Sequence, residues 1–142
     1  MLDLDSFIKH LQQAKLSAVT AFNPWSDHDA QYDIDSDAPM VRSAQLREYL
    51  RVRIGKAKYI FLAEGLSYQW GKFTGIAMTS ERIILGYHEQ VPAEAVFAIE
   101  PKRTSSQGIS SSVDKLGMAE PTASIVWKAI LKNKVPPQEV VL

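Results

Sequence analysis

Apolar residues recur with a helical period in two parts of the first half of the chain. In residues 3–14 and 39–54 they return every three to four positions between polar side chains, which predicts two amphipathic helices. Asp5 or Ser6 is the expected cap of the first helix. Gly55 follows the second helix and is expected to end it.

Two further helices are predicted from their starting residues. Thr79 is the expected cap of a short helix that continues through residues 83–85. A longer helix is expected to open at Glu120 and Pro121, with Trp127 on its flank. Its predicted inner face carries Ile125, Val126, Ala129 and Ile130.

Two short apolar runs lack the helical period. Residues 59–63 and 140–142 are continuously apolar. They predict adjacent parallel strands over residues 59–63 and 138–142, covered on both faces. Helices and strands in this order predict an α/β fold with right-handed crossovers and ligands at the carboxyl ends of the strands. Because the second run is still apolar at Leu142, we expect the chain to be a C-terminally incomplete single domain over residues 1–142.

Composition narrows the function classes. The chain has 142 residues, no cysteine, and 16 basic against 16 acidic side chains, which is typical of one soluble globular domain. Without cysteine there are no disulfides, thiolate zinc sites, cysteine-ligated iron-sulfur clusters or cysteine nucleophiles. No run approaches the roughly 18 apolar residues of a membrane span, and the start lacks a signal peptide's basic region. We therefore expect a cytoplasmic protein that does not enter membranes.

Charge gathers in two segments. Residues 40–58 hold six basic side chains and one acidic one, so Arg42, Arg47 and Arg51 either meet DNA phosphates or form a solvated face. Residues 20–38 hold five aspartates, but their order lacks the glycine and final glutamate of a calcium-binding EF-hand loop. The three histidines lack ligand spacing, and we expect a solvated acidic loop and no metal.

A glycine-bearing loop follows the first predicted strand. It runs from Glu64 to Glu81 and holds Phe73 between Lys72 and Gly75. Backbone N–H groups in such a loop can approach a ligand closely, and an aromatic ring there can stack on a planar base. The alternative is that Phe73 is a core residue beneath the loop.

This loop resembles the first motif region of the uracil-DNA glycosylase superfamily. In members whose loop reads Gly-Glu-Ala-Pro-Gly and then Arg-Phe-Ser-Gly-Ile-Pro-Phe-Thr-Ser-Glu, the matching residues are Glu64, Phe73, Gly75, Ile76, Thr79, Ser80 and Glu81. Three flanking segments also resemble parts of the family: Asn23-Pro24-Trp25, residues 46–50 and residues 120–127. The likeness covers about residues 20–142.

The resemblance implies a three-layer α/β/α fold with a mostly parallel central sheet. A pocket at the strand ends would receive a uracil flipped out of DNA, since the glycosidic bond is not reachable inside the base stack. Phe73 would stack on the base, and Glu64 would orient or activate water. The loop around Gly65, Ser67 and Gly75 would bind the base and the water. The alternative for Glu64 is a carboxylate that pairs with an arginine or is solvated.

The resemblance also implies a DNA-phosphate site at Pro121, Thr122 and Ser124, where the exposed N–H groups of a helix start suit an anion. The alternative for Thr122 is an ordinary helix cap. No cofactor is expected, and the expected partner is uracil-containing or single-stranded DNA.

The chain also departs from the family. Residues 63–67 replace Gly-Glu-Ala-Pro-Gly, and Gly65 stands where some branches carry a catalytic aspartate. The family's uracil-reading asparagine and its histidine loop would follow Leu142. The intact parent is expected to be a hydrolase of base-excision DNA repair. The alternatives are a non-catalytic nucleic-acid or nucleotide-binding module with the same fold, and a small-molecule hydrolase that uses the same loop.

Overall fold

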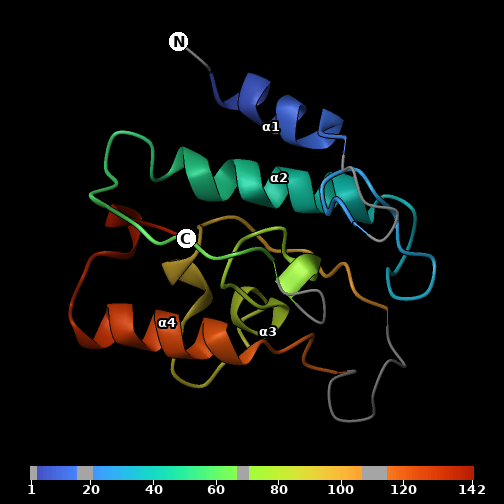
Figure 1. Cartoon of the computed structure of the whole chain (residues 1–142). Coiled ribbons are helices and arrows are strands. Elements are labelled where there is room, and N and C mark those ends of the chain that lie inside the picture. The colour runs from blue at the N-terminus through green and yellow to red at the C-terminus, as the bar shows by residue number, and fades with distance from the viewer. Residues whose placement is uncertain (1–2, 16–20, 67–70, 107–114) are drawn as a thin grey trace.

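The computed structural model describes residues 3–15, 21–66, 71–106 and 115–142 (Figure 1). Helices dominate these residues, and the only strands among them form one two-stranded sheet. The α-helices and strands are α1 (Leu4–Gln13), α2 (Ala38–Arg51), β1 (Tyr59–Ile60), α3 (Glu81–Ile84), α4 (Pro121–Lys132) and β2 (Val140–Val141). The 3₁₀ turns are η1 (Gly71–Phe73), η2 (Ala93–Ala95) and η3 (Pro137–Glu139).

The N-cap of α1 lies before both predicted cap residues. Asp3 caps it by accepting a hydrogen bond from the Ser6 N–H at 2.8 Å. The prediction of Asp5 or Ser6 is therefore wrong, because the Asp5 carboxylate pairs with Arg47 of α2 instead. This pair and the packed face of α1 hold α1 along α2 (Figure 1).

The two strands confirm the predicted parallel pair. Tyr59 lies opposite Val140, and Ile60 lies opposite Val141. The predicted extents of both strands, 59–63 and 138–142, are wrong, because β1 and β2 have two residues each. The predicted burial of the first strand is also wrong, since Ile60 is 70% exposed. In the part of the chain that the structure describes, no third strand extends the sheet and no helix covers Ile60, so its face stays open to solvent.

The helix α4 confirms the predicted start but turns a different face inward. Ala123, Trp127 and Ile130 are buried, which is the i, i+4, i+7 spacing of one helix face. Ile125 was expected inside and is 66% exposed. The helices α2 and α4 lie on opposite sides of the region that holds the strands and the glycine-bearing loop (Figure 1).

The core between α2 and α4 includes a buried arginine. Arg53 is 1% exposed and stacks on the Tyr49 ring, with its guanidinium carbon 3.8 Å from the ring centroid. It donates to the backbone carbonyls of Tyr49, Ala95, Val96 and Val140. Burial lowers the pKa of Arg53 below its ordinary value. Arg53 thereby joins α2 to β2 without a carboxylate partner among the described residues.

Among the described residues, none of the helices has the length and apolar character needed to cross a membrane.

Candidate functional site

Two tryptophans from distant segments hold the glycine-bearing loop. The indole N–H of Trp25 donates to the Gly75 carbonyl at 3.1 Å, and that of Trp127 donates to the Thr79 hydroxyl at 3.1 Å. Within the loop, the Thr74 hydroxyl accepts a hydrogen bond from the Ile76 N–H and lies 2.8 Å from the Thr79 carbonyl. The loop is therefore fixed from both sides and from within.

Thr79 does not cap the next helix. The helix α3 has Ser80 at its N-cap position, whereas Thr79 donates its hydroxyl proton to the Ala77 carbonyl and accepts from Trp127. The prediction of Thr79 as the cap is wrong, because its hydroxyl is used in a tertiary contact.

Gly75 is a site of close packing. Its φ is +69°, which favours glycine. A Cβ atom there would lie 2.9 Å from Trp25 Nε1 and 3.1 Å from Arg42 Cβ. The space left by the missing side chain is thus filled by the protein itself and not by a ligand. Gly65 differs, because a Cβ there would meet nothing within 4 Å.

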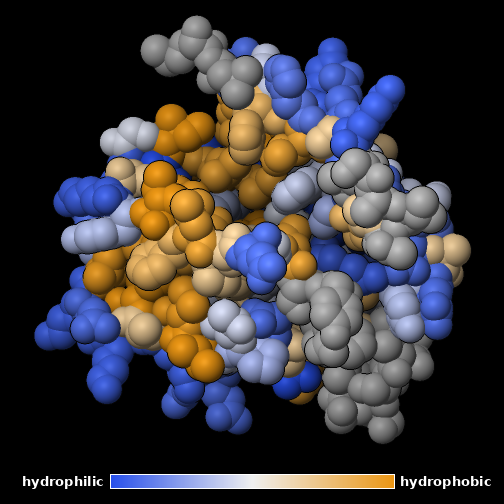
Figure 2. All heavy atoms as spheres, viewed as in Figure 1, coloured by the Kyte–Doolittle hydropathy of each residue, from blue (hydrophilic) through white to orange (hydrophobic). Residues whose placement is uncertain are grey.

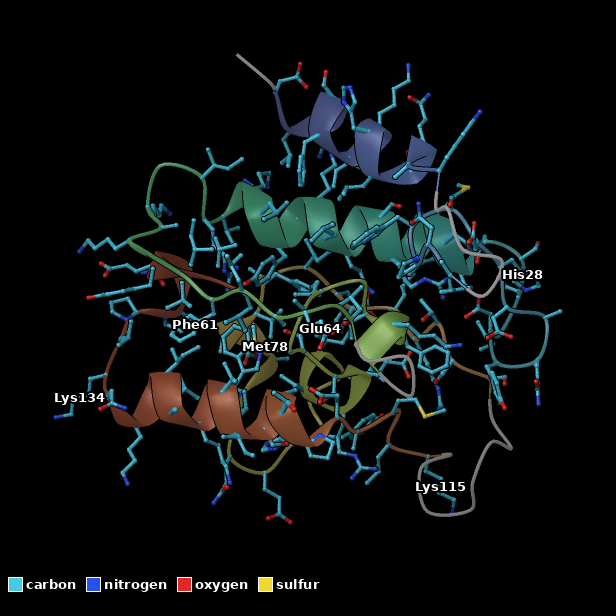
Figure 3. The ribbon with its side chains drawn as sticks, in the orientation of Figure 1. His28, Phe61, Glu64, Met78, Lys115 and Lys134 are labelled. Carbon is cyan, nitrogen blue, oxygen red and sulfur yellow. The ribbon has the colours of Figure 1, made fainter. Side chains whose placement is uncertain are left out.

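Met78 adopts a left-handed backbone conformation in the same loop. Its φ is +46°, which is uncommon for a residue other than glycine (Figure 3). Such strained residues persist only where the surroundings hold them, and they cluster at functional loops. The bonds of Thr74 and Thr79 on either side hold Met78 in place.

Glu81, the last residue of the resembling motif, is a fully buried carboxylate. One oxygen accepts from the backbone N–H groups of Thr104 and Ser105 at 2.8 and 3.0 Å. The other accepts from the Ser105 hydroxyl at 2.5 Å and from the Met118 N–H at 3.2 Å. These bonds stabilise the buried charge, so Glu81 ties two distant backbone stretches to α3.

Phe73 lies at the centre of the loop and is fully buried. The neighbouring Lys72 ammonium lies 5.2 Å from the Phe73 ring centroid. The carbonyl of Phe73 accepts a hydrogen bond from the Thr104 hydroxyl. The structure therefore places the ring inside the protein, and stacking on a base stays a prediction that requires the ring to become accessible.

Glu64 and Gly65 lie in the open. Both are exposed beyond the carboxyl end of β1, and no hydrogen bond or ion pair to Glu64 forms within the described ranges (Figure 3). One alternative was that Glu64 pairs with an arginine. None of the described arginines forms such a pair. Ser67 lies outside the described residues, so its predicted contact with a base stays a prediction.

The N-terminus of α4 is capped by a carboxylate side chain. The Glu120 carboxylate accepts from the N–H groups of Thr122 and Ala123 at 3.0 and 2.6 Å. Thr122 is therefore not the cap, and these N–H groups are not free donors for a DNA phosphate. The phosphate site at Pro121, Thr122 and Ser124 stays a prediction. A phosphate there would have to be bound by the hydroxyls of Thr122 and Ser124.

One of these hydroxyls already has a partner. The His88 ring lies with Nε2 3.0 Å from the Ser124 hydroxyl oxygen, and its Nδ1 accepts from the Gln90 N–H at 3.2 Å. Because Nδ1 is an acceptor, the neutral ring carries its proton on Nε2 and donates it to Ser124. Burial, with the charges of Lys128 and Arg82 acting in the same direction, lowers the pKa of His88. His88 therefore positions Ser124 and does not act as a base toward it.

The arginines of α2 do not form a free basic face. Arg42 is fully buried and pairs with Asp33 at 2.7 Å, so its predicted contact with DNA is wrong. Arg47 pairs with Asp5, and Arg51 pairs with Glu48. These exposed pairs leave little uncompensated positive charge on the helix.

The acidic loop is only partly solvated. Asp33 is buried against Arg42, and Asp29 pairs with Lys72 at 2.5 Å. No group of three or more histidine, aspartate and glutamate side chains among the described residues is arranged to hold a metal ion. Two of the five aspartates, Asp29 and Asp33, are thus partners of basic side chains from other segments.

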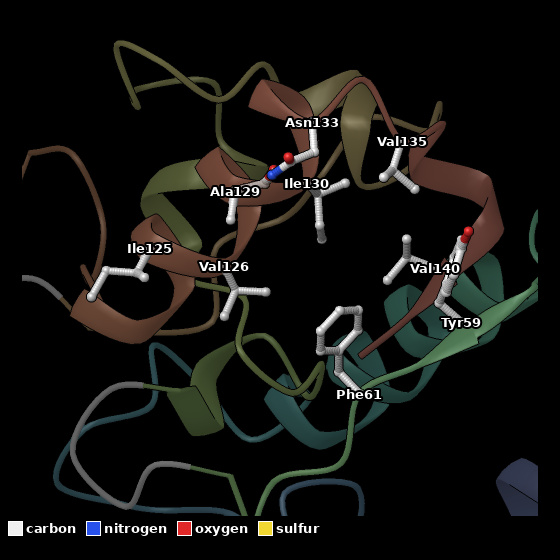
Figure 4. A pocket seen from close by; sticks show the side chains of 9 residues that line it. All are labelled: Tyr59, Phe61, Ile125, Val126, Ala129, Ile130, Asn133, Val135 and Val140. Atoms are coloured by element: carbon white, nitrogen blue, oxygen red, sulfur yellow. The ribbon is translucent and has the colours of Figure 1, made fainter.

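An apolar groove lies apart from this loop, between the two strands and α4. It has a volume of about 400 Å³, and its polar side-chain groups are the Asn133 amide and the Tyr59 hydroxyl (Figure 4). The other lining residues are Tyr59, Phe61, Ile125, Val126, Ala129, Ile130, Val135 and Val140. Apolar side chains gather on this side of the molecule (Figure 2). The groove contains none of the predicted site residues.

In the comparisons with known proteins, no family model, no curated sequence and no solved structure matches the chain. The likeness to the uracil-DNA glycosylase superfamily thus depends on the residues of this chain alone.

Proposed function

We propose that this chain forms the base-binding part of a uracil-DNA glycosylase-like domain with a three-layer α/β/α fold. Its activity is the hydrolysis of the N-glycosidic bond of a uracil flipped out of DNA. Phe73 stacks on the base once its ring is uncovered, and the exposed Glu64 carboxylate orients the attacking water.

One observation carries the proposal. The segments that resemble the family are far apart in the sequence, yet they meet at one loop: Trp25 bonds to Gly75, and Trp127 bonds to Thr79. The helix that contains residues 46–50 also joins them, because its Arg42 donates to the Pro24 carbonyl at 2.6 Å. Contact between these segments is what a single binding site built from them requires.

Two further features support the proposal. A parallel strand pair with α2 and α4 on opposite sides is the start of the proposed three layers. Glu64 follows the carboxyl end of β1, which is where open α/β sheets bind their ligands.

The proposed reaction is a hydrolysis by water. A water oxygen attacks the sugar C1′, the bond between C1′ and uracil N1 breaks, and the bonding electron pair leaves with the base. The Glu64 carboxylate accepts a proton from the water as it attacks.

A second function, base binding without catalysis, is favoured by the surroundings of Glu64. A general base is usually held in place by neighbours, but no hydrogen bond orients Glu64 within the described stretches. The chain could then recognise uracil without releasing it.

The test compares single-stranded oligonucleotides that differ only in one uracil or thymine. Tighter binding to the uracil strand supports the proposal, and equal binding contradicts it. Release of free uracil that is lost in Glu64→Gln supports the hydrolase. Uracil-dependent binding without release supports the non-catalytic alternative. Glu94→Gln, at another exposed glutamate, is the matched control.

A further inference from the structure

One ammonium group joins the acidic loop to the glycine-bearing loop. The Lys72 ammonium lies 2.5 Å from the Asp29 carboxylate and is surrounded by aromatic rings. The ring centroids of Phe22, Tyr32 and Phe73 lie 5.0, 5.1 and 5.2 Å from it. A carboxylate and three ring faces stabilise a cation by charge pairing and by cation–π attraction.

These contacts link two separate parts of the chain. Phe22, Asp29 and Tyr32 belong to residues 21–33, whereas Lys72 and Phe73 belong to η1. A solvated lysine would gain nothing from this arrangement, but the Lys72 side chain is only 12% exposed. Its position therefore draws residues 21–33 toward the Phe73 ring.

The same segment has a stronger anchor at Arg42. The Arg42–Asp33 pair is fully buried, and Arg42 also donates to the carbonyls of Pro24 and Asp27. The Lys72–Asp29 pair is partly exposed, with 12% and 21% of the two side chains accessible. Water and salt can compete for the exposed pair far better than for the buried one. The Lys72 contact is thus the one that can open. Arg42, the bond from Trp25 to Gly75 and the bridge between Asp33 and Ser105 keep the rest of the segment attached.

We propose that Lys72 is a latch that holds the turn at residues 29–32 closed over the Phe73 ring. A ring that stacks on a base must present a free face, and Phe73 has none in this structure because it is fully buried. Release of Lys72 from Asp29 and the three rings uncovers the ring, and uracil binding then competes with closure. Regulation of uracil binding by the latch rests on the proposed function. The existence of the latch does not depend on that function.

Hydrogen exchange measures the latch without any ligand. The Tyr32 and Asp33 N–H groups both donate to the Asp29 carbonyl, so their exchange reports opening of this segment. Lys72→Met keeps the side-chain length and removes the charge. Asp29→Asn keeps the shape of the partner and its bond from the Gln31 N–H. We expect at least ten-fold faster exchange at Tyr32 and Asp33 in both variants, with α4 unchanged.

Lys58→Met is the matched control. Lys58 also pairs with one carboxylate, Glu139, but it lies beside β1 and is 65% exposed. Its removal should leave exchange at Tyr32 and Asp33 as in the unaltered chain. Unchanged exchange in both Lys72→Met and Asp29→Asn would overturn the latch.

Uracil titration of the same proteins separates the two proposals. Several-fold tighter uracil binding by Lys72→Met supports control of the site by the latch. If the unaltered chain binds uracil and Lys72→Met binds it no better, the latch does not regulate uracil binding. Faster exchange in proteins that do not bind uracil leaves the latch standing and contradicts the proposed function.

Discussion

The indole N–H of Trp127 donates a hydrogen bond to the hydroxyl of Thr79 at 3.1 Å, across 48 residues of sequence. Trp127 lies on the buried face of α4, and Thr79 ends the glycine-bearing loop. Both side chains are fully buried, so neither group can exchange its partner for water. The bond fixes the end of the loop relative to α4.

Thr79→Val tests this bond, because valine keeps the shape and removes the acceptor. The indole N–H would then be buried without a partner, which costs about 1–3 kcal/mol of unfolding free energy. Urea denaturation measures the loss. Thr122→Val, on the exposed side of α4, is the control and should change stability little. Equal stability of Thr79→Val and the unaltered chain would show that the contact is unimportant.

Gly75→Ala is expected to destabilise the chain while Gly65→Ala is not. At Gly75 the new Cβ meets Trp25 and Arg42, and alanine disfavours the φ of +69°. Backbone strain alone costs roughly 1 kcal/mol or more. At Gly65 the Cβ enters open space without a left-handed φ. Thermal unfolding of the two variants makes the comparison, and similar midpoints would contradict the close packing at Gly75.

Glu81→Gln should destabilise the chain strongly. The two carboxylate oxygens of Glu81 accept from the N–H groups of Thr104, Ser105 and Met118, and an amide replaces one acceptor by a donor. A buried N–H group facing another donor loses its hydrogen bond, at a cost of about 1–3 kcal/mol for each group left unsatisfied. Chemical denaturation measures this loss. The exposed Glu64→Gln is the matched control, and an equal effect of both substitutions would refute the role of Glu81.

His88 gives the chain a pH-dependent contribution to stability. Its pKa in the folded state is lowered below the ordinary value of 6.5, mainly by burial, so the unfolded chain binds the proton more tightly. The contribution is present above pH 6.5 and is lost as the pH falls through the lowered folded-state pKa. Protonation of Nδ1 would also break its bond from the Gln90 N–H. His88→Asn should therefore lose less stability than the unaltered chain between pH 7 and 5.

Local signals in the sequence predicted most of the helices and the parallel pairing of the strands. Pro39 lies in the first turn of α2, and Glu120 with Pro121 opens α4, but α2 ends at Arg51, before the expected stop at Gly55. Such capping and turn residues act within a few positions, so their effect is visible in sequence. The pairing of β1 with β2 followed from two apolar runs and the helix between them.

The burial of charged side chains could not be predicted in this way. Arg42 has the helical spacing of a surface residue, and only the return of residues 23–33 onto α2 makes it internal. Glu81 stood in the resembling motif, but its burial depends on Thr104 and Ser105, which lie more than twenty residues away. The inner face of α4 was predicted by counting apolar residues, and Trp127 was placed on its flank. The Thr79 hydroxyl satisfies the indole N–H, which allows Trp127 to be buried.

The contacts of the Lys72 latch had only one visible signal in the sequence, the position of Lys72 next to Phe73. Its other members, Phe22, Asp29 and Tyr32, lie in a segment whose aspartates suggested full solvation. A local excess of acidic residues did not reveal that Asp29 and Asp33 each have a basic partner elsewhere in the chain.

The most direct test of the proposed base stacking on Phe73 is to titrate uracil into Phe73→Leu and into Phe61→Leu. Chemical-shift changes monitor the binding. Leucine keeps much of the buried volume of Phe73, and circular dichroism confirms that the variant is folded. Stacking of a base on an aromatic ring contributes on the order of 1–3 kcal/mol, so Phe73→Leu should weaken uracil binding roughly ten-fold or more. Phe61 lines the apolar groove away from the loop, and its replacement should leave uracil binding unchanged. Unaltered binding by a folded Phe73→Leu, or no binding by the unaltered chain, would contradict the account.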